Sequence, residues 1–149
     1  MDPAYILEIR AFNRWYTSII GLLDRYYLNS GYSLTEVRVL YEIYHGRGVM
    51  TASELIALLG LDKGYLSRIL RQFEKDKLLE KKRSGTDKRS FYLCLSKKGS
   101  EVFGKLDRAS QEQLVRLFES LTDEELRRLM RHMKEIREII FRYESTYYY

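Results

Sequence analysis

Residues 51–90 read TASELIALLGLDKGYLSRILRQFEKDKLLEKKRSGTDKRS and contain the strongest local structural signals of the chain. Thr51 and Glu54 stand three residues apart ahead of an apolar run, which is a capping-box signature, and they predict a short helix over 52–59. Gly60 can adopt the left-handed backbone of a sharp turn. Asp62 can cap a second helix over about 63–76. The stretch therefore predicts two short helices joined by a tight turn.

The second predicted helix separates into an apolar face and a polar face. Leu66, Ile69, Leu70 and Phe73 follow helical spacing, so we expect them to pack inward. Small, hydroxyl, amide and guanidinium groups lie on the other side, and such groups can contact base edges and phosphates in a DNA major groove. These residues are Gly64, Ser67, Arg68, Arg71 and Lys75, flanked by Tyr65 and Gln72. An ordinary solvated helix face is the alternative interpretation.

Two segments with strand-like alternation follow this helix. Residues 78–83 and 90–95 flank the turn-rich segment 84–87 and predict a β-hairpin, with Val49 and Met50 as a short third strand. An arginine at a hairpin tip can enter a DNA minor groove. A basic hairpin after a capped helix-turn-helix predicts a winged helix-turn-helix over about 33–96. The cations of the hairpin are Lys81, Lys82, Arg83, Lys88 and Arg89.

The excess positive charge is confined to this region. Residues 62–89 contain ten Lys or Arg and five Asp or Glu, whereas the whole chain contains 26 and 21. The net charge of +5 is thus the same for the segment and for the chain, and the remaining residues balance. A local concentration of cations is typical of a surface that binds phosphates.

The helices and the hairpin described above resemble those of a known family. LTEVRVLYEI at 34–43 and the run from 51 to 99 are similar to the MarR family of bacterial and archaeal transcriptional regulators, and the similarity covers nearly the whole chain. The resemblance implies a homodimeric winged-helix repressor or activator whose DNA binding is often relieved by a small ligand. It also implies that residues 63–75 form the recognition helix and that Asp87 and Arg89 match the Asp-x-Arg motif of the wing.

From the face of the helix and the resemblance together we assign roles in binding double-stranded DNA. Arg89 is expected to enter the minor groove, oriented by a salt bridge to Asp87. The remaining residues fall into two groups, one that contacts base edges and one that contacts only phosphates. Base edges and nearby phosphates are assigned to Gly64, Tyr65, Ser67, Arg68, Arg71 and Gln72, and phosphates to Lys63, Lys75, Lys82, Arg83 and Lys88.

A different function stays open beside this one. Residues 10–43 more closely resemble a subgroup in which this module is fused to a GNAT-type acetyltransferase. The sequence ends at Tyr149, so we expect no room for that second domain. The alternative is a regulatory or interaction module associated with such an acetyltransferase. RNA binding is disfavoured, because no exposed aromatic platform on a sheet is evident.

Helices with matching apolar seams are predicted at the two ends of the chain. Pro3 suits the first turn of a helix that runs to about residue 29.

A long helix begins at about residue 97 and is interrupted at Leu121 and Thr122. Thr122 with Glu125 then starts a final helix, and Ser33 with Glu36 starts a helix that runs to about residue 45. The seam residues are Tyr5, Ile9, Phe12, Tyr16, Ile19, Leu23 and Tyr26 in the first helix, and Leu126, Leu129, Met133, Ile136, Ile140, Tyr143 and Tyr147 in the last.

Spacings of three and four give these seams a period near 3.5, which is typical of helices that pack lengthwise on one another. We expect the helices over about 3–29 and 97–146 to form a homodimer that binds a pseudo-palindromic operator. A monomer with the two helices paired internally is the alternative. The expected fold is mainly α with a small β wing, in one domain over 1–149.

Four residues are candidates for an effector pocket: Arg14, Trp15, Tyr26 and Tyr41. Plain helix-helix core is the competing interpretation of those in the first helix. His45 and His132 are far apart and have no ligand cluster at zinc spacing, so neither a metal nor another cofactor is expected. Cys94 is expected to fill core space. No catalytic motif, secretory signal or membrane-spanning run is evident, so we expect a cytoplasmic protein that is not an enzyme.

Overall fold

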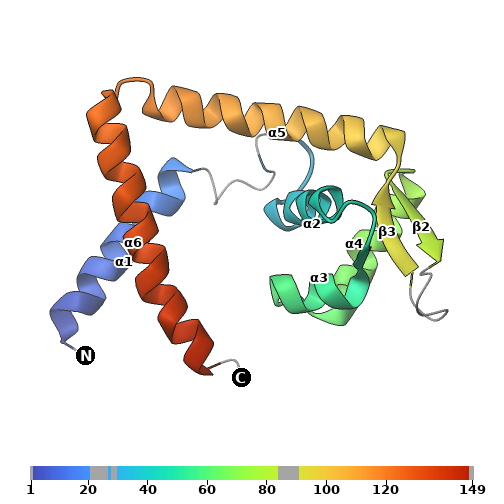
Figure 1. The fold of residues 1–149 in the computed structure, drawn as a ribbon, viewed down its shortest axis with the longest axis horizontal. Coiled ribbons are helices and arrows are strands. Elements are labelled where there is room, and N and C mark those ends of the chain that lie inside the picture. Colours follow the sequence, from blue (N-terminus) through green and yellow to red (C-terminus); the bar gives the residue numbers. More distant parts are fainter. Residues whose placement is uncertain (1, 21–26, 28–29, 84–90, 148–149) are drawn as a thin grey trace. The chain divides into compact units, whose positions relative to one another are not determined.

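The computed structural model describes residues 2–20, 27, 30–83 and 91–147, with side chains up to residue 140 (Figure 1). It divides into two compact units, Met1–Ser110 and Gln111–Tyr149, with the division inside α5. The elements in chain order are α1 (Pro3–Ile19), α2 (Leu34–His45), β1 (Met50–Thr51), α3 (Ala52–Leu59), α4 (Lys63–Lys75), β2 (Leu79–Arg83), β3 (Phe91–Leu95), α5 (Lys97–Phe118) and α6 (Asp123–Tyr147). The predicted mainly helical fold with a small β wing is confirmed.

Each predicted capping box is formed. In α3 the backbone N–H of Glu54 donates to the hydroxyl of Thr51 at 3.3 Å, and the backbone N–H of Thr51 donates to the Glu54 carboxylate at 2.7 Å. The same reciprocal pattern starts α2 at Ser33 and α6 at Thr122. These bonds satisfy backbone donors that a helix start otherwise leaves without partners, which is why the helix starts could be predicted.

The capping box of α3 gives stability a dependence on pH. Hydrogen bonds from the Thr51 backbone and hydroxyl lower the pKa of the Glu54 carboxyl below its ordinary value. Glu54 therefore stabilises the fold above the ordinary glutamate pKa of about 4.3, and this contribution is lost as the pH falls through the lowered folded-state pKa. Glu54→Gln keeps a capping side chain but removes the titration. We expect thermal unfolding to show a smaller loss of stability between pH 5 and pH 2 in this variant than in the parent chain, and superimposable profiles would contradict this.

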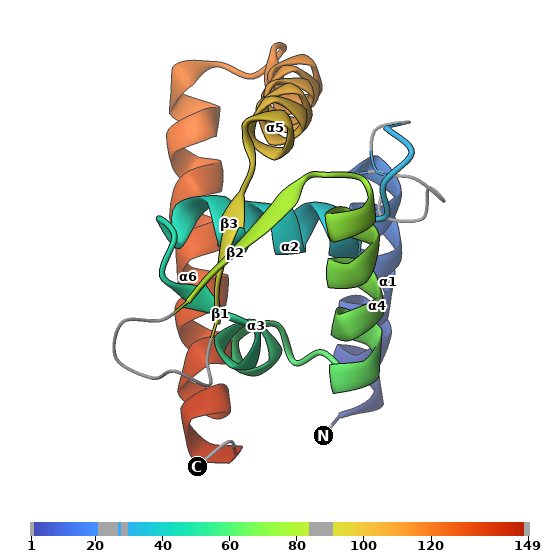
Figure 2. The same cartoon turned by 90° about the vertical axis from the view of Figure 1, so that its right-hand side faces the viewer.

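The sheet has the order β1-β3-β2, with antiparallel pairing throughout. Leu93 of β3 lies opposite Met50 on one side and Lys81 on the other. The predicted third strand is present as β1, shifted by one residue from 49–50 to Met50–Thr51, and it joins the start of α3 to the wing. Figure 2 shows α4 beside β2 and β3, with α3 below the strands.

One hydrophobic core joins α2, α3, α4, the wing and the first half of α5. Phe73 of α4 is fully buried, and its ring meets that of Tyr32 edge-on with centroids 6.5 Å apart. Leu78, Leu93 and Phe103 extend this core to the sheet and to α5. Helix α4 is therefore fixed on its apolar side by side chains from every neighbouring element.

A tight joint links the end of α4 to the start of α5. Lys77 has φ +61°, a left-handed conformation that few non-glycine residues adopt, and turns the chain from α4 into β2. Its carbonyl accepts a hydrogen bond from the Ser96 hydroxyl at 2.7 Å, and the Lys98 ammonium donates to the carbonyl of Asp76 at 2.8 Å. Gly99 is buried directly against the carbonyl of Leu78. The base of the hairpin and both helices thus meet within a few residues.

The prediction for the first helix was wrong in length. We expected it to run to about residue 29, but α1 ends at Ile19, with Ile20 as its C-cap at φ −89° and ψ 4°. Two adjacent β-branched residues followed by Gly21 have low helix propensity, which accounts for the early end. The seam residues Leu23 and Tyr26 lie outside the described residues.

Candidate DNA interface

The polar face of α4 is presented to solvent as predicted. Leu66, Ile69, Leu70 and Phe73 are buried and hold the opposite side of the helix against the core. The Asp62 carboxylate accepts the backbone N–H of Tyr65 at 2.9 Å and caps the helix. The predicted residues that are exposed along α4 are Lys63, Gly64, Ser67, Arg68, Arg71, Gln72 and Lys75.

Two contacts orient side chains on this face. The guanidinium carbon of Arg68 lies 5.7 Å from the centroid of the half-buried Tyr65 ring, at a distance typical of a cation–π contact. The Gln72 amide donates to the Asp76 carboxylate at 2.9 Å. Tyr65 therefore supports Arg68 from the side rather than projecting fully from the helix, and Gln72 is turned toward the C-terminal end.

The wing brings further cations next to α4. Lys82 and Arg83 are exposed at the end of β2. Asp87, Lys88 and Arg89 of the predicted wing tip lie outside the described residues.

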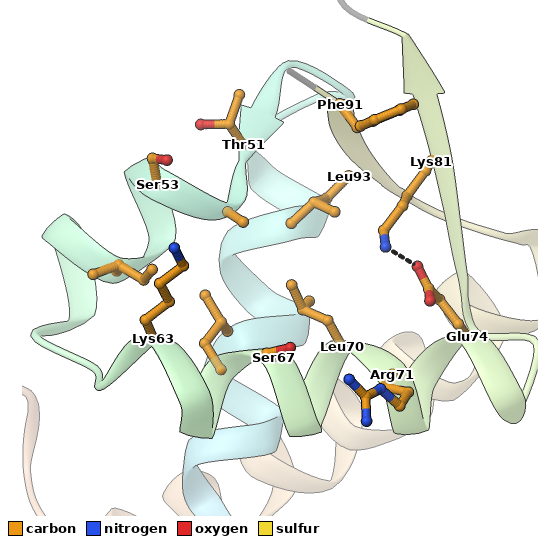
Figure 3. A pocket seen from close by; sticks show the side chains of 13 residues that line it. Thr51, Ser53, Lys63, Ser67, Leu70, Arg71, Glu74, Lys81, Phe91 and Leu93 are labelled. Atoms are coloured by element: carbon orange, nitrogen blue, oxygen red, sulfur yellow. Dashed lines mark ion pairs between the residues drawn. The ribbon is translucent and has the colours of Figure 1, made fainter. Parts of the chain in front are cut away.

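A cleft of about 430 Å³ separates α4 from α3 and the wing (Figure 3). Leu66, Leu70 and Leu93 contribute to its apolar floor, and hydroxyl and charged groups surround that floor. Figure 3 shows Lys63 extending from α4 toward α3 at one end, and Lys81 extending from β2 toward Glu74 of α4 at the other. Lys81 and Glu74 form an ion pair, with 44% and 37% of their side chains exposed.

The cleft contains residues that the sequence analysis did not assign to the site. Thr51 and Ser53 come from the start of α3, and Glu74 and Lys81 form its ion pair. The sequence did contain a signal that could have placed Lys81 in the site. Lys81 lies two positions after the buried Leu79 and therefore on the same face of the strand. That face is the one packed toward α4.

The described effector candidates lie in aromatic surroundings. Trp15 is 58% exposed on α1, with its ring centroid 5.8 Å from that of Phe12. Tyr41 stacks on His45 with centroids 4.1 Å apart, and its backbone carbonyl faces the His45 Nδ1 at 2.9 Å. Arg14 is exposed on α1, and Tyr26 lies outside the described residues. His45 is thus a helix-end residue, as expected.

No group of three or more His, Cys, Asp or Glu within the described part of the chain could hold a metal ion. Likewise, no helix within those ranges combines the length and the apolar character that crossing a bilayer requires. Cys94 is buried in β3 with its thiol 3.8 Å from the carbonyl of Gly48, which agrees with its expected role in the core.

Comparison with known proteins agrees with this geometry. Residues 30–90, which hold α2, the helix-turn-helix and β2, match the sequence model of the MarR family. This segment resembles the MarR family. An uncharacterised HTH-type transcriptional regulator of Bacillus subtilis, YkoM, is 27% identical over 126 residues, which are 85% of this chain and 81% of the relative.

Solved structures of transcriptional regulators share the fold of this chain. A single-residue mutant of E. coli MarR, complexed with operator DNA, superposes with a TM-score of 0.69 at 22% identity, covering 91% of this chain and 99% of that one. The organohalide-sensing regulator RdhR-CbdbA1625, in its 2,4-dichlorophenol-bound form, gives 0.65 at 19% identity over 93% and 81%. These likenesses confirm the winged helix-turn-helix fold for this chain.

Proposed function

We propose that this protein binds double-stranded DNA sequence-specifically, as a homodimer on a pseudo-palindromic operator, and so regulates transcription. The observation that carries the proposal is the exposed cationic face of α4 beside the cationic strand β2, on a fold of the MarR type. A solved relative of this fold is complexed with operator DNA. The role is binding rather than catalysis, and it requires the cytoplasm, where the DNA of a bacterium or archaeon lies.

The residues of α4 and the wing have separate roles in the proposal. Arg68 and Arg71 meet base edges, with Gly64, Tyr65, Ser67 and Gln72 around them. Arg89 enters the minor groove, with Asp87 to orient it. Phosphates are held by Lys63, Lys75, Lys82, Arg83 and Lys88.

The homodimer is supported by apolar side chains that the single chain leaves exposed. Ile9 of α1 is 53% exposed, and Ile136 and Ile140 of α6 are 45% and 55% exposed. Covering such a residue contributes roughly 1.5–3 kcal/mol. A two-fold dimer also presents two recognition helices one turn of DNA apart, roughly 34–36 Å. The paired seams and the paired half-sites therefore favour the same assembly.

A small-molecule effector completes the proposal, with Arg14, Trp15, Tyr26 and Tyr41 as the candidate contacts. A relative of the same fold is an organohalide sensor solved with 2,4-dichlorophenol. The alternative role beside a GNAT-type acetyltransferase has no structural observation in its favour.

Substitutions in α4 and β2 separate base recognition from phosphate binding. Arg68→Ala should cost about 1–3 kcal/mol on the preferred duplex and relax discrimination at one base pair, if Arg68 contacts a base through both guanidinium nitrogens. Lys82→Ala should weaken binding to every duplex alike and reduce the slope of log K against log salt by about 0.9.

The measurement is selection of bound duplexes from a random pool, followed by salt titration of each variant on the selected and a scrambled duplex. Recovery of a two-fold symmetric site would support the homodimer. Unchanged binding in both variants would show that these roles are wrongly assigned.

A further inference from the structure

The cleft between α4 and the wing has a defined place in the proposed complex, and this inference rests on the proposed function. If α4 enters a major groove and the wing enters the neighbouring minor groove, one sugar-phosphate strand must pass between them. The cleft is the space that separates these two elements. Its occupant in the complex is therefore the backbone of double-stranded DNA.

The groups that surround the cleft suit that occupant. Ser53 supplies a hydroxyl from the start of α3, and Lys63 supplies an ammonium from the start of α4, whereas the Thr51 hydroxyl already donates to Glu54. Hydroxyl and ammonium groups are among the side-chain donors that contact phosphate oxygens. The apolar floor suits the carbon face of a deoxyribose.

Among the described residues around the cleft, Glu74 is the one side chain with the wrong charge for this ligand. Its carboxylate is paired with the ammonium of Lys81, as the dashed line in Figure 3 marks. Both side chains are more than one-third exposed, and ion pairs at such exposure contribute little to stability. The ammonium of Lys81 can therefore exchange the Glu74 carboxylate for a DNA phosphate that enters the cleft.

We propose that Glu74 and Lys81 form an exchange pair, in which Lys81 leaves Glu74 to hold a backbone phosphate when DNA binds. Glu74 then lowers the affinity for every duplex, because each binding event must break the ion pair. The ion pair therefore reduces the affinity for all DNA sequences equally, and the side chains of α4 determine which sequence is preferred.

The opposite signs of two substitutions test the exchange. Lys81→Gln should weaken binding about 3- to 10-fold on selected and scrambled duplexes alike and reduce the salt slope by about 0.9. Glu74→Gln should tighten binding about 2- to 5-fold on both duplexes. In the Lys81→Gln background, Glu74→Gln should have little effect, because its influence acts through Lys81.

Glu80→Gln is the matched control, since it removes the same charge from β2 itself, one position from Lys81 and on the opposite face of the sheet. Equal tightening by Glu74→Gln and Glu80→Gln would overturn the exchange in favour of a general charge effect. Weakening by Glu74→Gln would overturn it in favour of a simple brace between α4 and the wing. Tightening that persists without Lys81 would overturn it in favour of direct repulsion of phosphate by Glu74.

Arg68→Ala in the same titrations separates this inference from the proposed function. If the parent chain binds and Arg68→Ala loses specificity while Glu74→Gln changes nothing, the exchange is wrong and the proposed function stands. A parent chain that binds no duplex overturns both.

Discussion

Replacing Gly99 with alanine is expected to destabilise the winged unit more than any other addition of a single methyl group to a described glycine. A Cβ at this position would overlap the carbonyl oxygen of Leu78 and lie 2.9 Å from its carbonyl carbon. The obstacle is backbone, and that backbone is held by hydrogen bonds from Ser96 to Leu78 and Lys77. Overpacking costs typically 1–3 kcal/mol where side chains can adjust, so we expect about 3 kcal/mol or more here.

The same helix supplies a matched control for this substitution. A Cβ at Gly104 would meet only the end of the Arg108 side chain, at 4.0 Å. Gly104→Ala should therefore be neutral or stabilise the helix by up to about 1 kcal/mol. Urea denaturation followed by circular dichroism measures both variants. Equal stability of the two would mean that the start of α5 can move away from Leu78 without cost, which contradicts a tight joint.

Placing a carboxylate in the seam of α6 is expected to abolish both the dimer and tight DNA binding. Ile136 is 45% exposed in the single chain and is flanked at helical spacing by Met133 and Ile140. Loss of its burial costs roughly 1.5–3 kcal/mol per subunit, hence about 3–6 kcal/mol per dimer. Ile136→Asp should therefore raise the dimer dissociation constant roughly 10²- to 10⁴-fold, with the desolvation of two carboxylates in addition.

Sedimentation equilibrium and mobility shift on a two-half-site duplex give the two readouts. Lys134→Asp is the control, because residue 134 lies on the opposite side of the helix by spacing and forms an exposed ion pair with Glu138. This control should remain dimeric and keep its affinity. A dimeric Ile136→Asp variant would show that the seam of α6 is not the dimer contact.

Most helix starts and turns of the fold could be predicted from signals between residues close together in the sequence. The capping boxes at Ser33, Thr51 and Thr122 involve residues three apart, so helix starts could be predicted to the residue. The turn between α3 and α4 was also a local signal, because Gly60, at φ +60°, adopts a left-handed conformation that glycine permits. The end of α1 was predicted poorly, because the apolar spacing of Leu23 and Tyr26 continues beyond the point at which propensity ends the helix.

Features that depend on distant residues could not be predicted. The contact of Gly99 with Leu78 and the bond from Lys98 to Asp76 join segments about twenty residues apart. The pairing of Glu74 with Lys81 requires the angle between α4 and β2, which no periodicity contains. The exposed face of α4 was predictable because spacing within one helix decides it.

The order of the sheet has a consequence for handling the protein. β2 is an edge strand, and an edge strand with open backbone groups can recruit a strand from another molecule and begin aggregation. After the buried Leu79, its residues are Glu80, Lys81, Lys82 and Arg83. Charged residues, lysine above all, are a common protection of such edges in natural sheets. Removing these cations to study DNA binding therefore also removes a barrier to intermolecular strand pairing, and Lys82 and Arg83 variants call for light-scattering controls.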